Sequence, residues 1–296
     1  MHKISDVLAS SLVTPLRNLA FWSASAVSPV IVAERDNIRY YLNTHDREIC
    51  RKIFVTGRFE RSAMEAAFRS LSQLNGNAFD LSGKLFLDLG ANIGSATLLA
   101  LLRFNAKTAL AVEPDPENFV LLQNNVLAND LQDRVTSIRR ALSDSPGDVF
   151  LALSEKNRGN HILTRDPGGV PAEWSATISV QAVRLDDLFV SEDVDPLDIG
   201  MCWIDVEGYE GHLLRGASTL LATGVPTVAE FWPYGLELSG GYDDLCDAVN
   251  SHYAGFVDLR RPFDESGAPI VRATGSLGDL RAAYPGRECS ELLLIP

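Results

Sequence analysis

The chain has few cysteines, no run of basic residues and no apolar stretch long enough to cross a bilayer. Its four cysteines lie far apart and none belongs to a C-x-x-C pair, so neither a zinc site nor a disulfide framework is indicated. The longest apolar stretches have the length of strands, whereas a membrane span needs roughly 20 apolar residues. The N-terminus also lacks the basic-then-apolar pattern of a secretory signal. We therefore expect a soluble, cytoplasmic protein without stable membrane insertion.

Positive charge is scarce as well. The chain has 26 Lys and Arg residues against 39 Asp and Glu residues, which gives a formal net charge of −13. Binding to a nucleic-acid backbone requires a basic footprint, so we expect no nucleic-acid partner. The sequence does not indicate an oligomeric state.

The remaining composition and its patterning are those of a globular α/β protein. The chain has 296 residues, 46% of them hydrophobic, and can bury a large core. From residue 84 onward, strand patterns alternate with helix patterns, which predicts a doubly wound, mostly parallel sheet of seven strands. We expect an N-terminal helical cap over residues 1–80 and a sheet-containing domain over 81–296, with an insertion at about 143–195. The expected strands of the sheet are 84–90, 108–114, 135–142, 201–208, 226–233, 255–261 and 291–296.

The first of these strands ends in a glycine-containing turn, Asp88-Leu89-Gly90-Ala91-Asn92-Ile93-Gly94. In a parallel sheet the ligand binds beyond the carboxyl ends of the strands, where the first strand-to-helix turn approaches it most closely. The two glycines leave room for backbone to touch a ligand, and the following helix begins with free N–H groups. The carboxylate of Asp88 ends a buried strand and therefore needs a cationic or hydrogen-bonding partner. The ammonium and sulfonium groups of S-adenosylmethionine would supply such positive charge.

The second strand ends in an acid, Glu113, followed by Pro114 and Asp115. In dinucleotide folds an acid at this place accepts hydrogen bonds from ribose hydroxyls, and the Pro-Asp pair here ends the strand and begins the next helix. An ordinary strand-to-helix turn also favours glycine, but the turn together with a spaced acid predicts an adenosyl cofactor. A dinucleotide is disfavoured because Asp88 would repel its pyrophosphate. A P-loop is excluded because no G-K-[ST] follows the first strand.

With these residues in place, the chain resembles the FkbM family of S-adenosylmethionine-dependent methyltransferases over about residues 40–232. These are class I methyltransferases with a Rossmann-like fold, described as O-methyltransferases of secondary metabolites and saccharides. The matching blocks are G-R-F-E at 57–60, D-L-G-A-N-I-G at 88–94, E-P-D at 113–115, N-N-V at 124–126 with Asn129, A-L-S-D at 141–144, R-L-D-D-L at 184–188, I-D-V-E-G-Y-E at 204–210 and Glu230. The resemblance implies that the cofactor is held by Asp88, Gly90, Ala91, Asn92, Gly94, Ser95, Glu113, Pro114, Asp115 and Asp205, with Arg140 and Ala141 near the adenine.

A second acidic segment, Asp205-Val206-Glu207-Gly208, ends the strand expected at 201–208. Alternate residues of a strand point the same way, so both acids can face one site. One acid would contact the methionine end of the cofactor, and the other would orient or deprotonate an acceptor hydroxyl. Alternatively, Glu207 caps the helix that begins near Tyr209, as acids often do.

Two further candidates for the chemistry are Glu230 and His161. Glu230 follows a strand where the acceptor pocket is expected, although a structural salt bridge explains it almost as well. His161 lies in the insertion and suits proton transfer near neutral pH, although a lone loop histidine is more often solvated. No metal site is predicted from Asp205 and Glu230, because no His or Cys lies at a ligand spacing.

These observations predict transfer of a methyl group from S-adenosylmethionine to a hydroxyl oxygen of a small molecule or saccharide. The expected catalytic residues are Asp205, Glu207, Glu230 and His161. Two alternatives stay open: a methyltransferase for nitrogen or carboxylate acceptors, and a noncatalytic module that binds the cofactor. The choice of acceptor depends on loops and on the cap, because function does not follow from fold.

Overall fold

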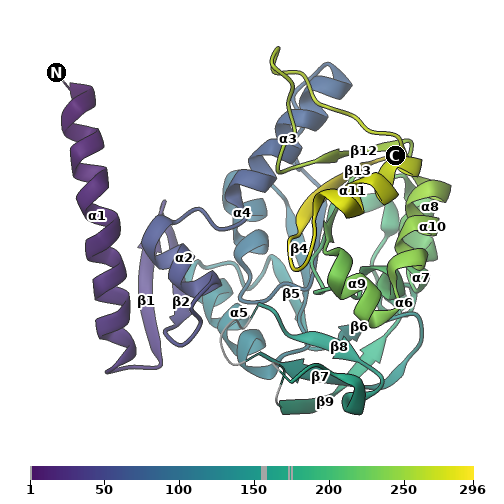
Figure 1. The fold of residues 1–296 in the computed structure, drawn as a ribbon, viewed down its shortest axis with the longest axis horizontal. Helices are drawn as coiled ribbons and strands as arrows, with labels where there is room; N and C mark the ends of the chain where they lie inside the picture. Colours follow the sequence, from purple (N-terminus) through teal and green to yellow (C-terminus); the bar gives the residue numbers. More distant parts are fainter. Residues whose placement is uncertain (1, 155–158, 173, 175) are drawn as a thin grey trace.

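A seven-stranded sheet forms the centre of the protein in a computed structural model, which describes residues 2–154, 159–172, 174 and 176–296 (Figure 1). The strand order is β12-β13-β11-β10-β3-β4-β5. Its strands are β3 (Leu85–Leu89), β4 (Thr108–Val112), β5 (Val135–Ile138), β10 (Ile199–Ile204), β11 (Thr227–Phe231), β12 (Gly255–Asp258) and β13 (Ser290–Ile295). Strand β13 runs antiparallel to β11 and β12, and all the other neighbouring strands of this sheet are parallel. This confirms the doubly wound, mostly parallel fold.

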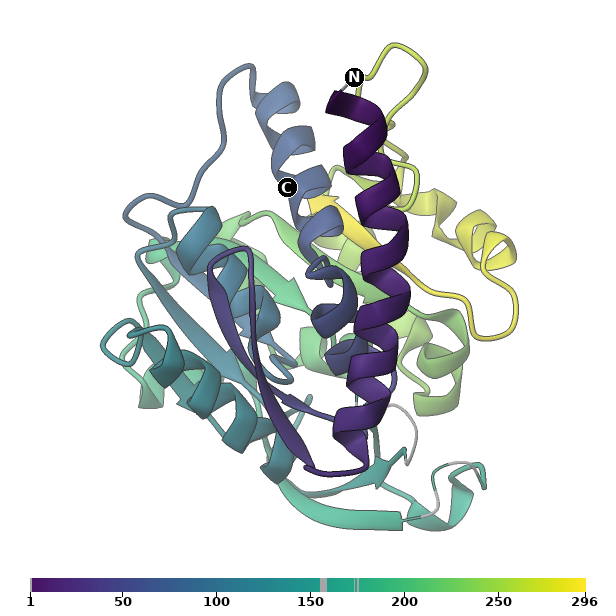
Figure 2. The same ribbon diagram turned by 90° about the vertical axis from the view of Figure 1, so that its left-hand side faces the viewer.

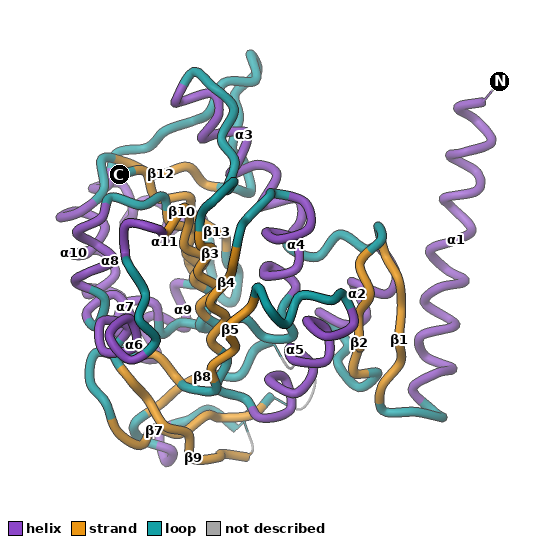
Figure 3. The backbone as a smooth tube through the Cα atoms, turned by 180° about the vertical axis from the view of Figure 1, so that it is seen from behind, coloured by secondary structure: helices purple, strands orange, loops and turns teal. Residues whose placement is uncertain are grey.

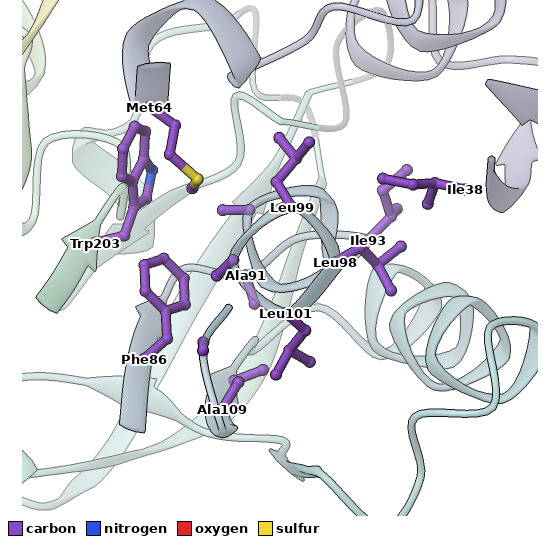
Figure 4. Close-up of a cluster of buried hydrophobic side chains, with 14 of the residues drawn as sticks. Ile38, Met64, Phe86, Ala91, Ile93, Leu98, Leu99, Leu101, Ala109 and Trp203 are labelled. Atoms are coloured by element: carbon purple, nitrogen blue, oxygen red, sulfur yellow. The ribbon is translucent and has the colours of Figure 1, made fainter. Parts of the chain in front are cut away.

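Helices cover both faces of this sheet, and this explains why the central strands are almost continuous apolar runs (Figure 3). One face carries α3 (Arg61–Asn75), α4 (Ser95–Arg103) and α5 (Pro116–Ala128). The other carries α6 (Leu185–Ser191), α7 (Glu210–Arg215), α8 (Ser218–Thr223), α9 (Pro233–Ser239), α10 (Tyr242–His252) and α11 (Leu277–Ala283). Figure 4 shows the first core, where Met64 of α3 and Phe86 of β3 lie near Trp203 of β10.

The insertion forms a second, four-stranded sheet in the order β6-β9-β7-β8. It consists of β6 (Ala141–Leu142), β7 (Gly147–Leu153), β8 (Ile162–Thr164) and β9 (Ala176–Val183). The single strand expected at 135–142 is wrong, because the chain leaves the large sheet after Ile138 and Ala141 pairs with Ala182 of β9 instead. Residues 155–158, 173 and 175 of the expected insertion lie outside the described residues.

The N-terminal segment contains a hairpin as well as helices. It consists of α1 (His2–Ser25), β1 (Val30–Arg35), β2 (Ile38–Asn43) and α2 (Ile49–Thr56), followed by α3. The hairpin is held to α5 by two asparagines, since Asn125 Oδ1 accepts from the Tyr41 N–H and Asn129 Oδ1 accepts from the Arg39 N–H, the latter at 2.9 Å. Both asparagines belong to the N-N-V block. They accept hydrogen bonds from backbone N–H groups on the edge of β2 that faces away from β1, where no other described strand pairs with it.

Helix α1 lies at the outer edge of the molecule, and Figure 2 shows it beside the β1–β2 hairpin. It packs on α2, where Arg17 donates to the Val55 carbonyl at 3.1 Å and the Phe21 side chain is fully buried. Among the described residues, no helix combines the length and the apolar character needed to cross a membrane.

Candidate active site

A cavity of about 530 Å³ opens at the carboxyl ends of the parallel strands. It is lined by the turn after β3, the end of β4, the segment after β10 and the end of β11, together with residues of the small sheet. The α2–α3 connection and the C-terminal region complete its wall with Phe59, Glu60, Arg260 and Arg287. Its volume is within the range of small-molecule sites, and it lies where ligands bind in open α/β sheets.

Glu113 ties the glycine turn to the end of β4. Its Oε2 accepts from the Asn92 N–H and its Oε1 accepts from the Asp115 N–H, both at 2.8 Å. The side chain is 5% exposed and lines the cavity. Burial raises the pKa of the Glu113 carboxyl to about 8, against the lowering effect of these two backbone hydrogen bonds. Because a carboxylate has about four acceptor positions, lone pairs remain for a ligand.

Asp88 lies behind the turn and does not line the cavity. Its Oδ2 accepts from both the backbone N–H of Thr97, at 2.9 Å, and the Thr97 hydroxyl. The Asp88 side chain is 1% exposed, and burial raises its pKa to about 6. The sequence predicted that this buried carboxylate has a cationic or hydrogen-bonding partner, and that partner is the first turn of α4. Asp88 thereby holds α4 against the end of β3.

Asp115 is a helix cap. Its Oδ1 accepts from the N–H groups of Glu117 and Asn118, at 2.9 and 2.7 Å, which begins α5 at Pro116 as the sequence predicted. Its Oδ2 lies 3.8 Å from His161 Nε2. The His161 ring lines the cavity, and its Nδ1 accepts from the Ser154 N–H at 2.9 Å, which orients the ring.

Three acids expected in the chemistry do meet in the cavity. Asp205, Glu207 and Glu230 each offer one carboxylate oxygen, and these oxygens lie within 4.8 Å of one another. The Asp205 Oδ1 and Glu230 Oε2 atoms are enclosed by the protein and have no hydrogen-bond partner. The alternative in which Glu207 caps the following helix is wrong, because α7 begins at Glu210 after Tyr209 and has no side-chain cap hydrogen bond.

Glu210 is fully buried at the start of α7 and holds the loop in place. Its Oε1 accepts from the N–H groups of Val206 and Gly208, at 3.0 and 3.3 Å. Glu207, between them, has a left-handed backbone with φ 53°. Such a conformation costs a non-glycine residue free energy and persists only where neighbours impose it.

Burial and the charges of neighbouring acids raise the pKa of every acid in this cluster. Burial is the main cause for Asp205, raised to about 8, and the charges of Glu210 and Glu291 add to it. Burial followed by the charge of Asp205 raises the pKa of both Glu207 and Glu230 well above the usual range. A cationic ligand would favour the charged forms, so binding of such a ligand releases protons.

We expect the ligand-free protein to lose stability as the pH rises from about 5 to about 8. In this window Asp205 and Glu113 hold their protons in the folded state, with a pKa of about 8 each, but not in the unfolded chain. The folded state then binds more protons, so the free energy of unfolding falls as pH increases. Thermal unfolding should show a midpoint lower by at least about 4 °C at the higher pH, with a smaller change in Asp205→Asn. A midpoint that rises over the same interval contradicts this assignment.

The expected site residues divide into two groups. Those that line the cavity are Gly90, Asn92, Glu113, Pro114, Arg140, Asp205, Glu207, Glu230 and His161. Those outside its lining are Asp88, Ala91, Gly94, Ser95, Asp115 and Ala141. Sequence reasoning assigned no role to Glu60, Glu210, Glu291, Arg260 or Arg287. Glu60 and Glu210 lie in the G-R-F-E and I-D-V-E-G-Y-E blocks, so the family resemblance could have identified them as site residues. Glu291, Arg260 and Arg287 lie in none of the matching blocks.

Glu60 connects the N-terminal segment to the glycine turn. Its Oε2 accepts from the Ser95 hydroxyl at the start of α4, and its backbone is left-handed with φ 57°. Burial and the charge of Asp88 raise the pKa of Glu60 well above its ordinary value. Ser95 therefore bears on the site indirectly, by positioning a cavity-lining acid.

The sequence profile described as the methyltransferase FkbM domain matches residues 88–247, more than half of the chain. Methyltransferase sdnD of Sordaria araneosa is 26% identical over 181 residues, which are 52% of this chain and 70% of that protein.

Two solved structures are similar to this chain at low identity. Methyltransferase FkbM from Methylobacillus flagellatus KT is 16% identical with a TM-score of 0.40, over 73% of this chain and 44% of that one. P. horikoshii TYW2, solved in complex with MeSAdo, is 11% identical with a TM-score of 0.39, over 90% and 70%. The matched part is thus less than half of the Methylobacillus chain. On the extent of the profile match, this chain belongs to the FkbM methyltransferase family.

Proposed function

We propose that the cavity binds S-adenosylmethionine at its glycine-turn end and a hydroxylated small molecule or saccharide at its acidic end. The observation that carries the proposal is the single cavity that joins Asn92 and Glu113 to the acids Asp205, Glu207 and Glu230. A donor site and an acceptor site must share one space, because methyl transfer requires the two reactants in line.

The residues of the donor end suit an adenosyl ligand. Glu113 keeps free lone pairs for ribose hydroxyls, as the two backbone donors occupy only part of its capacity. Arg140 and Ala141 would lie near the adenine, and Asp205 would meet the methionine end. The remaining members of the proposed set act by shaping the turn and the helices beside it: Asp88, Gly90, Ala91, Gly94, Ser95, Pro114 and Asp115.

S-adenosylmethionine, when bound, supplies a methyl group on a positively charged sulfur, which keeps the electron pair of the broken C–S bond as the acceptor oxygen forms the new C–O bond. The chain must orient the acceptor hydroxyl and receive its proton. Glu207 and Glu230 are the proposed acceptors of this proton, and His161, which also lines the cavity, is a further candidate. Burial raises the pKa of both carboxyls, which brings their proton affinity closer to that of a useful base.

The test has a binding arm and a turnover arm. Calorimetric titration with S-adenosylhomocysteine should give one site per chain, and a panel of hydroxylated metabolites and saccharides should yield a methyl ether detected by mass spectrometry. With any acceptor found, we expect Glu230→Gln to lower kcat at least about 100-fold while leaving the affinity for S-adenosylhomocysteine within about threefold, which is less than one ordinary hydrogen bond contributes.

Three results would redirect the proposal. Methylated nitrogen or carboxylate products would replace the hydroxyl acceptor, and binding without turnover on every acceptor would leave a noncatalytic cofactor-binding module. Failure of S-adenosylhomocysteine to bind would end the donor assignment.

Glu237→Gln is the matched control for the measurement of kcat, because Glu237 lies outside the cavity and pairs with Arg281.

A further inference from the structure

Asp205, Glu207 and Glu230 form an acid cluster for which the described residues supply no cationic partner. The three carboxylates come from the loop after β10 and from β11, and one oxygen of each lies within 4.8 Å of the other two. Like charges this close repel strongly in a desolvated site. No Lys, Arg or His within the described residues forms an ion pair with any of these three acids.

Unsatisfied oxygens point to a missing ligand. Asp205 Oδ1 and Glu230 Oε2 have no solvent access and accept no hydrogen bond. Beside them Glu210, fully buried, uses Oε1 to hold the loop but leaves Oε2 without a partner. A buried acceptor without a donor costs about 1–3 kcal/mol, and more when it is charged. Such groups persist where a ligand that the site is built for completes them.

The spacing and chemistry of the cluster fit a hard divalent cation. Ligand oxygens on opposite sides of Mg²⁺ lie about 4.2 Å apart, because each bond is about 2.1 Å long. The cluster oxygens lie within 4.8 Å of one another, so side-chain rotations that move them by a few tenths of an ångström would bring them onto one ion. Carboxylate oxygens without nitrogen or sulfur are the ligands that Mg²⁺ and Mn²⁺ prefer. The absence of His and Cys at ligand spacing, from which the sequence predicted no metal, therefore excludes only softer ions.

We propose that Asp205, Glu207 and Glu230 bind one divalent cation, Mg²⁺ in function, at the acceptor end of the cavity. The ion would keep open positions on the cavity side, because only three side chains supply ligands, and an acceptor with a hydroxyl or carbonyl oxygen can occupy them. With the ion bound, Glu207 and Glu230 would be ligands rather than proton acceptors, and the acceptor proton would pass to His161, the other candidate that lines the cavity. This role for the ion in methyl transfer rests on the proposed function, whereas metal binding itself does not.

The other acids near the cluster strengthen its attraction for a cation. The charges of Glu291 and Asp88 bear on Asp205, and that of Glu113 bears on Glu207. The cations that line the same cavity and would oppose binding are Lys52, Arg140, Arg260 and Arg287. An organic ammonium group is the rival occupant, since three carboxylates can also accept from one –NH₃⁺.

Metal binding is tested with Mn²⁺ as the probe, on full-length protein first stripped with a chelator. Electron paramagnetic resonance of free Mn²⁺ should show one saturable site per chain, displaced by excess Mg²⁺. Glu207→Gln and Glu230→Gln should each weaken Mn²⁺ binding at least about tenfold, because each removes a charged ligand. Glu48→Gln is the matched control, since Glu48 lines the cavity outside the cluster and should change the affinity less than threefold.

Folding of each variant is checked by thermal unfolding, and Mg²⁺ should raise the midpoint of the wild type but not of Glu230→Gln. No saturable Mn²⁺ site, or equal weakening by Glu48→Gln, overturns the proposal. Displacement of Mn²⁺ by methylammonium at equal concentration would assign the cluster to an ammonium instead. S-adenosylhomocysteine is titrated in the presence of chelator, so that binding there preserves the proposed function even if the metal site fails.

Discussion

Replacement of Gly90 by alanine is expected to lower the free energy of unfolding by at least about 4 kcal/mol and to abolish binding of S-adenosylhomocysteine. Gly90 has φ 95°, and a Cβ atom there would lie 1.7 Å from the carbonyl oxygen of Asp205. Neither backbone can move aside, because β3 and β10 pair in register up to Leu89 and Ile204 and the Asp205 N–H donates to the Leu89 carbonyl at 2.9 Å. Urea denaturation followed by circular dichroism measures the loss.

Gly83 offers a matched control for this substitution. It also has a left-handed backbone, with φ 79°, but a Cβ atom there meets nothing within 4 Å. Gly83→Ala should therefore cost only the conformational term of about 1 kcal/mol. Similar losses in the two variants would show that the contact with Asp205 does not decide the requirement for glycine at position 90.

Replacement of Glu113 by glutamine is expected to raise the Kd for S-adenosylhomocysteine at least about 10-fold, since the ligand loses a hydrogen bond of about 0.5–1.5 kcal/mol and the turn loses its shape. The Glu113 carboxyl accepts two backbone N–H groups, and the amide nitrogen of glutamine would face one of them as a second donor. The turn at Asn92 and the backbone at Asp115 would both shift. Calorimetric titration measures the change.

Glu117→Gln provides the control, because this exposed acid lies four residues after Glu113, in the first turn of α5, and outside the cavity. Its Kd should stay within about twofold of the wild type, since neutralising an exposed charge changes a binding energy by a few tenths of a kcal/mol. An unchanged Kd in Glu113→Gln, with an intact unfolding transition, would remove Glu113 from the donor site.

The N-terminal segment contributes to the cavity in a way that bears on acceptor choice. Lys52 of α2 and Phe59 and Glu60 of the α2–α3 connection line its wall. We propose that this segment, within the unit expected over residues 1–80, covers the acceptor. Its outer helix α1 lies away from the cavity and packs on α2.

Local sequence was sufficient for the glycine turn and for Glu113. The need for glycine at position 90 and the strand end before Pro114 each depend on a few consecutive residues, whose turn chemistry is readable without the fold. The partner of Asp88 was not readable in the same way. Either a cationic ligand or the first turn of α4 could satisfy its carboxylate, and only the orientation of that helix, with Thr97 beside the acid, decided between them.

The same distinction applies to the acids of the cavity. Asp205 and Glu207 were expected together because they are two residues apart, but Glu60 and Glu291 reach the cavity from segments far from both. An isolated polar residue carries no period and no turn signal, so its burial beside other acids is invisible before the chain folds.

The sequence by itself determined the class of fold, the position of the ligand-binding edge and the glycine turn with its acid, because hydrophobic period and turn chemistry are properties of neighbouring residues. Only the tertiary structure decided that Asp205, Glu207 and Glu230 converge while Asp88 turns away, and that β13 inserts antiparallel between β11 and β12. Those outcomes depend on contacts between segments distant in the chain, whose geometry is set by packing of the whole core.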